Sequence, residues 1–437
     1  MLFSGCSEVE PPIPTPDRVL LVVTDATHAA HLSAYGNPHG LTPSIDELAS
    51  TGVVFTRAFS NNTWTLSSTA SLFTGQLQEH HGAVTNHHRL DESARTTAEY
   101  FRNARWKTAA FVQMAYASEP FGFGQGFDSF RYYGKGQPGR AGQTIPQTME
   151  WLNENRGEKW FVYLHLRRPH SPYKPNSKAL ADLDEYCEFA DGRRDEEFMF
   201  ADSFGIRSMS EAERAHIEHL YQANLATTDA LLKQVFDHAR SERALIVITS
   251  DHGEALGQHG VFGHGVNLWA ESIDIPLIFW WPTARPLAVS HPVSTIDILP
   301  TMLDIANLGL GERETMDGVS LYPLLLEPTA AEPTPVIATG RYSLENDPKV
   351  AVIEGDWKLI RDPDGSTQLF DRSADRGDEV DRSSEQPELV LRLSQLAAEW
   401  QDSNRDVARS GVRHEGLDDE LESDLEALGY LENAESD

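Results

Sequence analysis

Two runs of apolar residues, each followed by an acidic side chain, predict two strands of a buried parallel sheet. Residues 18–24 read Arg-Val-Leu-Leu-Val-Val-Thr and are followed by Asp25, and residues 244–250 repeat the pattern before Asp251 and His252. Continuous apolar runs are typical of strands that helices cover on both faces. Ligands of open α/β sheets bind at the carboxyl ends of strands, so we expect Asp25, Asp251 and His252 to converge. Either aspartate alone could be an ordinary turn residue.

Residues 63–75 predict a short amphipathic helix whose first turn is rich in hydroxyl side chains. Thr65 stands near its start, and Gly75 closes it. Free backbone N–H groups and the positive end of the helix dipole favour attack on an anionic ester at such a position. Thr and Ser at helix starts are more often caps. Thr65 therefore becomes a candidate nucleophile only together with the strand-end side chains.

The pattern changes after about residue 330. Before it, strands alternate with helical stretches, which favours one large α/β domain over residues 17–330, preceded by an N-terminal tether at 1–16. Residues 328–335 are rich in Pro, Ala, Thr and Glu. Beyond them, residues 349–353, 357–361 and 368–370 predict a small antiparallel meander, and a leucine stripe at 389, 393 and 396 with Trp400 predicts a packing helix. We expect a C-terminal α+β subdomain at 331–405 and an acidic tail at 406–437.

The order and spacing of these motifs resemble the sulfatase family of the alkaline phosphatase superfamily over nearly the whole chain. The matching segments are 22–25, 42–49, 70–75, 169–173, 249–254, 263–265, 297–301, 317–321, 357–360 and 425–431. The resemblance implies an alkaline-phosphatase-like α/β fold: a mostly parallel sheet sandwiched by helices, with a small C-terminal antiparallel sheet plus helix. It also implies a metal-dependent hydrolase or transferase that acts on ester bonds.

The departures from that family are as informative as the matches. Sulfatases carry Cys or Ser at the position of Thr65, matured to formylglycine within a Cys-x-Pro-Ser-Arg pattern that ends in Thr-Gly-Arg. Here Ser67 and Thr69 replace the proline and arginine of that pattern, and Gln76 replaces the final arginine. Threonine cannot give the same aldehyde, because its β-carbon carries a methyl group. The second acid expected after Asp25 is Ala26. A formylglycine sulfatase is therefore not expected.

The resemblance to phosphoesterases elsewhere in the superfamily implies that Thr65 is a metal-activated nucleophile. Thr65 would form a covalent intermediate with a phosphate mono- or diester. Asp25, Thr65, Asp251 and His252 are the expected metal ligands, and this mixed oxygen and nitrogen set favours Zn²⁺ or Mn²⁺, with Ca²⁺ or Mg²⁺ as alternatives. Two other functions stay open: a sulfuric ester hydrolase that works without formylglycine, and a catalytically silent binding protein on the same fold.

Two histidines match family positions that touch the anionic group. His170 follows the apolar strand predicted at 161–166, in a proline-bounded loop, and His264 stands between two glycines. Each could donate a hydrogen bond to the ester, protonate the leaving oxygen or ligate a second metal. The alternative is that both are ordinary loop residues in a chain with 17 histidines.

The charge balance limits the classes of partner that the protein can bind. The net charge is −31, from 36 Lys and Arg against 67 Asp and Glu, which weighs against nucleic acid and anionic membranes and leaves a small anionic ester as the expected partner. No protein partner can be inferred.

The two cysteines, Cys6 and Cys187, provide neither a thiolate zinc site nor a disulfide framework. Residues 2–6 resemble the end of a bacterial lipoprotein signal, which predicts a lipid anchor at Cys6 and an exported, periplasmic or cell-surface protein, with a cytoplasmic protein as the alternative.

Overall fold

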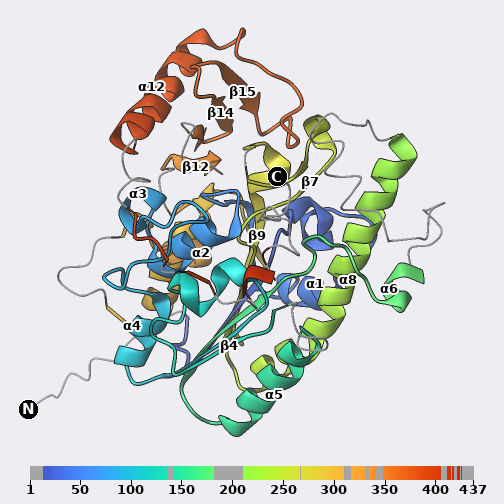
Figure 1. Ribbon diagram of the computed structural model, residues 1–437, viewed down its shortest axis with the longest axis vertical. Coiled ribbons are helices and arrows are strands. Elements are labelled where there is room, and N and C mark those ends of the chain that lie inside the picture. The colour runs from blue at the N-terminus through green and yellow to red at the C-terminus, as the bar shows by residue number, and fades with distance from the viewer. Residues whose placement is uncertain are drawn as a thin grey trace, which may run out of the picture.

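The computed structural model describes residues 13–134, 141–181, 210–265, 267–309, 316–330, 334–340 and 348–404, with short C-terminal pieces at 411–414, 416–417, 421–423 and 425. A large part built on one sheet carries a smaller part formed by the C-terminal strands and helix (Figure 1). Cys6 and Cys187 lie outside the described residues, as do most of the tether at 1–16 and of the tail at 406–437. The domain limits at 16, 330 and 405 stay predictions.

A nine-stranded sheet forms the centre of the larger part, in the order β10-β2-β9-β6-β1-β5-β3-β4, with β11 also paired to β2. All pairs are parallel except those of β9, which runs antiparallel to both β2 and β6. The mostly parallel sheet predicted from the sequence is confirmed. The strands are β1 Arg18–Thr24, β2 Val53–Phe59, β3 Lys107–Val112, β4 Ser129–Tyr132, β5 Trp160–Leu166, β6 Leu245–Thr249, β9 Asp274–Trp280, β10 Leu287–Val289 and β11 Val293–Ser294.

The register brings three strand ends to the same edge of the sheet. Strand β1 lies between β5 and β6, and Val23 is paired with Thr249 on one side and with His165 on the other. The residues that follow β1 and β6 therefore emerge side by side, as the two apolar runs predict. The carboxyl end of β5 lies at the same level.

Alternating side chains of β1 supply two separate hydrophobic cores, one on each face of the sheet. Val19, Leu21 and Val23 pack in the core that includes Leu66 and Phe73 of α2. Leu20 and Val22 pack in the other core, with side chains of α8. This double burial explains the uninterrupted apolar sequence.

The helices are α1 Pro43–Ala49, α2 Thr65–Thr74, α3 Gln78–His81, α4 Thr97–Asn103, α5 Thr144–Glu154, α6 Ser177–Ala181, α8 Glu211–Ser241, α9 Ala270–Ile273, α10 Ile298–Ile305, α11 Tyr322–Leu326 and α12 Pro387–Asn404. Short 3-10 helices span Ala29–His31, Ser33–Tyr35, Ala115–Ala117, Glu119–Phe121, Ala141–Gln143, Gln258–Gly260 and Thr295–Asp297. A small hairpin joins β7 Ala255–Leu256 to β8 Phe262–Gly263. No helix of the described segments combines the length and apolar character needed to cross a bilayer.

The C-terminal part is a four-stranded antiparallel sheet of β12 Val336–Gly340, β13 Lys349–Glu354, β14 Trp357–Arg361 and β15 Thr367–Asp371. Helix α12 covers one face, where Leu393 and Ala397 pack on β13, β14 and β15. The other face packs on Phe59 and Ile273 of the larger part. The predicted meander and helix are confirmed, with β12 as an additional strand.

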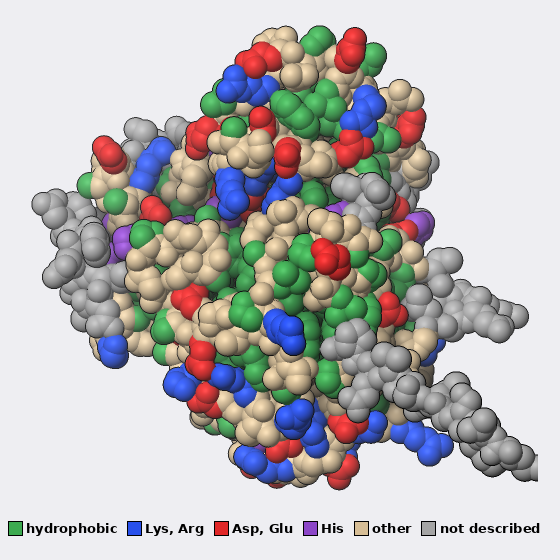
Figure 2. Space-filling model, turned by 180° about the vertical axis from the view of Figure 1, so that it is seen from behind, with side chains coloured by type: hydrophobic (Ala, Val, Ile, Leu, Met, Phe, Trp, Pro, Cys, Tyr) green, Lys and Arg blue, Asp and Glu red, His purple; other side chains and the backbone are tan. Residues whose placement is uncertain are grey.

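The surface mixes both signs of charge. Figure 2 shows the face opposite to that of Figure 1, on which acidic and basic side chains are interspersed over the larger and the smaller part. The excess of acidic residues is therefore not gathered in one patch on this face.

Candidate active site

Asp25 and Asp251 meet at the carboxyl edge of the sheet, where both are completely buried. The backbone N–H of Asp25 donates to the carbonyl of Leu166 over 2.9 Å, which continues the β1–β5 pairing by one residue. The Asp251 Oδ1 atom accepts hydrogen bonds from the backbone N–H groups of Ala26 at 3.2 Å and His252 at 3.0 Å. These contacts fix one oxygen of Asp251 and leave Oδ2 facing Asp25 and the histidines.

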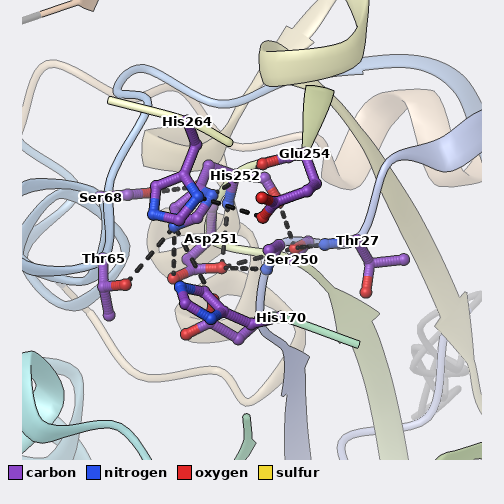
Figure 3. A network of polar contacts seen from close by, with 12 residues as sticks. Thr27, Thr65, Ser68, His170, Ser250, Asp251, His252, Glu254 and His264 are labelled. Atoms are coloured by element: carbon purple, nitrogen blue, oxygen red, sulfur yellow. Dashed lines mark hydrogen bonds and ion pairs between the residues drawn. The ribbon is translucent and has the colours of Figure 1, made fainter. Parts of the chain in front are cut away.

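His252 lies beside Asp251 (Figure 3), and its Nε2 atom faces the carboxylates of both Asp251 and Asp25. This atom is 3.5 Å from Asp251 Oδ2 and 3.8 Å from Asp25 Oδ1. The Nδ1 atom of the same ring lies 2.9 Å from the carbonyl of Gly253. A carbonyl can only accept, so Nδ1 carries the hydrogen and Nε2 presents its lone pair to the cluster. Metal-ligating histidines usually show this arrangement.

Thr65 is the first residue of α2 and is not its cap. Trp64 occupies the cap position in extended conformation, and its side chain makes no capping hydrogen bond. The Thr65 Oγ1 atom is buried and lies 3.4 Å from His252 Nε2. The helix ends at Gly75, whose φ of 64° is the left-handed conformation that glycine tolerates. The capping explanation for Thr65 therefore does not hold, and its hydroxyl faces the strand-end cluster.

Helix α2 is tied directly to the loop after β6. The hydroxyls of Ser60 and Ser68 both donate to the backbone carbonyl of Asp251. On the other side of this loop, the backbone N–H of Gly253 donates to the carbonyl of Ser272 over 2.9 Å. These three contacts hold the loop, and with it Asp251 and His252, at a fixed distance from Thr65.

His170 and His264 lie beside this cluster. The His264 ring stacks on His252 with 4.2 Å between centroids, and the His170 ring is 4.9 Å from His264. Glu254 accepts a hydrogen bond from Nδ1 of His264 over 3.1 Å. His170 Nδ1 lies 2.5 Å from the carbonyl of Ser171, so this nitrogen carries the hydrogen. Both predicted histidines are thus part of one site with Thr65 (Figure 3).

His165, which the sequence pattern does not mark as a site residue, also lies in the cluster. Its Nε2 atom is 3.3 Å from Asp25 Oδ2 and 3.9 Å from Asp251 Oδ2, and its Nδ1 atom is 2.9 Å from the Tyr163 hydroxyl. A histidine inside an apolar strand was the available signal, because a polar ring buried between two cores needs partners.

Burial and neighbouring charges shift the pKa values of the two aspartates in opposite directions. Burial, and then the Asp251 carboxylate, raise the pKa of Asp25 well above its usual value. Burial also opposes ionisation of Asp251, but His252, His165 and two backbone N–H groups outweigh it and lower the pKa of Asp251. Burial lowers the pKa of His165 to about 4. Burial, and then His264, lower the pKa of His170 well below its usual value, so its ring is neutral at neutral pH.

The donor atoms fit a divalent cation. Both oxygens of Asp25, Oδ2 of Asp251 and Nε2 of His165 are buried without a hydrogen bond. Ligand atoms of Asp25, His165 and Asp251 all lie within 4.8 Å of one another, the one such group among the described residues. Buried carboxylates without hydrogen bonds are costly unless a cation compensates them.

Comparison with known proteins identifies the family. The sequence model of the Sulfatase family matches residues 17–308, about two thirds of the chain. Arylsulfatase K of Mus musculus is 24% identical, over 86% of this chain and 78% of that protein. Choline-sulfatase of Rhizobium meliloti (strain 1021) is 28% identical, over 54% of this chain and 48% of that protein. The fold is also that of phosphonate monoester hydrolase of Agrobacterium radiobacter, with a TM-score of 0.72 at 19% identity, over 89% of this chain and 96% of that chain. The chain therefore belongs to the sulfatase family of the alkaline phosphatase superfamily, whose members are ester hydrolases that generally use a divalent metal.

Proposed function

We propose that the protein hydrolyses phosphate mono- or diesters, or transfers their phosphoryl group, with Thr65 as the nucleophile. The observation that carries this proposal is the position of the Thr65 hydroxyl, buried at the start of α2 and 3.4 Å from His252, beside carboxylate oxygens that have no hydrogen bond. The free backbone N–H groups at the start of α2 can bind the anionic ester next to this hydroxyl.

Asp25, Asp251, His252 and Thr65 would hold the cation. Two carboxylates and an imidazole form a mixed oxygen and nitrogen set, which favours Zn²⁺ or Mn²⁺ over Ca²⁺ or Mg²⁺. When bound, a divalent cation lowers the pKa of the threonine hydroxyl and neutralises charge on the ester.

The residues of the chain then divide the reaction between them. The Thr65 hydroxyl loses its proton to solvent and its oxygen forms a bond to phosphorus while the bond to the leaving oxygen breaks. His264, oriented by Glu254, gives a proton to that oxygen. The pKa of His170 is low and its Nδ1 hydrogen is engaged with the Ser171 carbonyl, so His170 Nε2 accepts hydrogen bonds rather than donating them. Water then attacks phosphorus and gives a proton to His264, the bond between phosphorus and Thr65 Oγ1 breaks, and the phosphate product leaves while Thr65 regains a proton from solvent.

Hydrolysis of sulfate esters is the second candidate. It is favoured by relatives such as arylsulfatase K and choline-sulfatase, which are named for that chemistry. It is disfavoured by Thr65 itself, because threonine cannot become formylglycine. Sulfate and phosphate esters have the same tetrahedral shape, so the site must be tested with both.

The test compares matched phosphate and sulfate esters with the wild type, Thr65→Ala and Thr65→Ser. We expect turnover of phosphate esters to exceed that of sulfate esters. Thr65→Ala should lower turnover by about three orders of magnitude or more, whereas Thr65→Ser keeps the hydroxyl and should retain most of it. A preference for sulfate esters would establish the second candidate. Metal-loaded protein that turns over neither class would point to a binding protein.

A further inference from the structure

His165 occupies an unusual position for a polar side chain. It belongs to β5, a strand whose seven residues are all buried, and the register places it level with Val23, two residues before Asp25. Its Nε2 atom has no hydrogen bond, although carboxylate oxygens of Asp25 and Asp251 lie 3.3 Å and 3.9 Å away. A fully buried imidazole nitrogen aimed at two buried carboxylates needs either a proton to share or a cation between them.

The spacing of the donor atoms matches a coordination shell. His165 Nε2 lies 3.3 Å from Asp25 Oδ2 and 3.9 Å from Asp251 Oδ2, and His252 Nε2 lies 3.5 Å and 3.8 Å from oxygens of the same two residues. Zinc bonds to nitrogen and oxygen are about 2.0–2.1 Å long, so adjacent ligands of a tetrahedral site are about 3.3 Å apart. Donor atoms of Asp25, His165 and Asp251 lie within 4.8 Å of one another, and the distances from each of the two imidazoles to the carboxylates are close to those between ligands of one cation.

The other side of the ring supports the same arrangement. A lone pair at Nε2 requires the hydrogen to be on Nδ1, and the Tyr163 oxygen lies 2.9 Å away and can accept it. His252 has the equivalent contact, from Nδ1 to the Gly253 carbonyl. Outer contacts of this kind set the tautomer and orientation of metal-ligating histidines.

The neighbouring sequence leaves room for a further ligand. Ala26 follows Asp25 in a left-handed conformation, with φ of 57°, and its backbone N–H donates to Asp251 Oδ1. No carboxylate is present at this position. The cluster thus has two acids rather than three, and the imidazole of β5 faces them.

We propose that His165 Nε2 is a direct ligand of the cation, in addition to His252, and that Tyr163 is a positioning residue that holds its ring. This inference rests on the metal-dependent function proposed above and makes it more specific. Two carboxylates and two imidazoles form a site for a borderline divalent cation of the Zn²⁺ class, and a poor one for Ca²⁺, which binds all-oxygen shells. The competing explanation is that Nε2 carries a hydrogen and donates it to Asp25.

X-ray absorption at the zinc edge of the Zn²⁺-loaded protein counts imidazole ligands without any assay of activity. We expect the count to fall by one in His165→Ala and by one in His252→Ala, and by two in the double variant. His81→Ala, which removes another buried histidine, is the matched control and should leave the count unchanged. An unchanged count in His165→Ala would overturn the proposal.

Zinc affinity, measured by competition with a chelator, provides a second readout. Tyr163→Phe should weaken Zn²⁺ binding by about 10- to 100-fold, as for other outer contacts, and His165→Ala by more than that. If His165→Ala does not fold, the wild-type count decides: two or more imidazoles support the proposal and one overturns it. A one-imidazole site in an active esterase would overturn this inference alone, whereas protein that binds no Zn²⁺ would overturn the proposed function as well.

Discussion

The tight approach between the loop after β6 and helix α9 leads to a prediction about Gly253. A Cβ atom added there would lie 2.1 Å from the carbonyl oxygen of Glu271 and 3.0 Å from its carbonyl carbon. Ordinary contacts begin at 3.4 Å, so Gly253→Ala must separate the two backbones by about 1.3 Å. Neither side is a flexible side chain, which makes this movement costly.

The loop that carries the proposed ligands is the part that should move. The Glu271 side of the contact is held in place, because Glu271 contacts His259 at 3.0 Å and the Ser272 hydroxyl donates to Asn267. Overpacking of this kind costs about 1–3 kcal/mol of stability. A shift of about 1 Å in a catalytic group can cost about 100-fold in rate. We therefore expect Gly253→Ala to lose both metal affinity and turnover, by about two orders of magnitude in turnover.

The assay measures Zn²⁺ affinity, turnover of the best ester and unfolding by urea for each variant. Gly142→Ala is the matched control, because a Cβ atom there would meet no atom within 4 Å. The control should match the wild type in all three measurements. Wild-type metal affinity and turnover in Gly253→Ala would refute the claim that this contact sets the position of His252, as would equal losses in the control.

Four further variants test the remaining parts of the site and its surroundings. Asp251→Asn removes one of the two carboxylates among the proposed ligands, so metal content, measured by elemental analysis, and turnover should fall together; full occupancy with normal turnover would remove Asp251 from the site. His264→Ala should slow esters with poor leaving groups far more than activated aryl esters, whereas His170→Ala should slow both classes equally, and the reverse pattern would exchange the two roles. Burial lowers the pKa of His81 from 6.5 to about 3, so below pH 6.5 the unfolded chain takes up a proton that the folded protein does not. The contribution of His81 to the free energy of unfolding is therefore fully present above pH 6.5 and falls on acidification, by about 2 kcal/mol at pH 5. His81→Gln should reduce the difference between urea unfolding at pH 7.5 and pH 5 by that amount, and an unchanged difference would contradict the assignment.

The sequence predicts the part of the site that lies immediately after strands. Asp25 and Asp251 could be placed because an apolar run of strand length ends just before each of them, and parallel strands present their carboxyl ends at one edge. The helix start at Thr65 could be placed because Gly75 closes the same segment. In these cases a local pattern determines the position of a side chain.

Residues whose role depends on pairing between distant segments cannot be predicted from the local sequence pattern. His165 is hidden inside an apolar strand, and only the register of β5 against β1 shows that it faces Asp25. The antiparallel direction of β9 cannot be predicted either, because an apolar run reads the same for a parallel and an antiparallel strand. Leu421 and Leu425 pack in the core that contains α2, although the composition around them is acidic. Their burial depends on a partner surface elsewhere in the chain.

The proposed covalent bond between Thr65 and phosphorus is tested most directly by mass spectrometry of protein quenched during turnover of a phosphate ester. The account predicts that the peptide containing Thr65 gains the mass of one phosphoryl group, that fragmentation places this group on Thr65, and that Thr65→Ala shows neither the modification nor significant turnover. Unmodified peptide at every quench time, together with near-normal turnover in Thr65→Ala, would contradict the account and assign the attack to water.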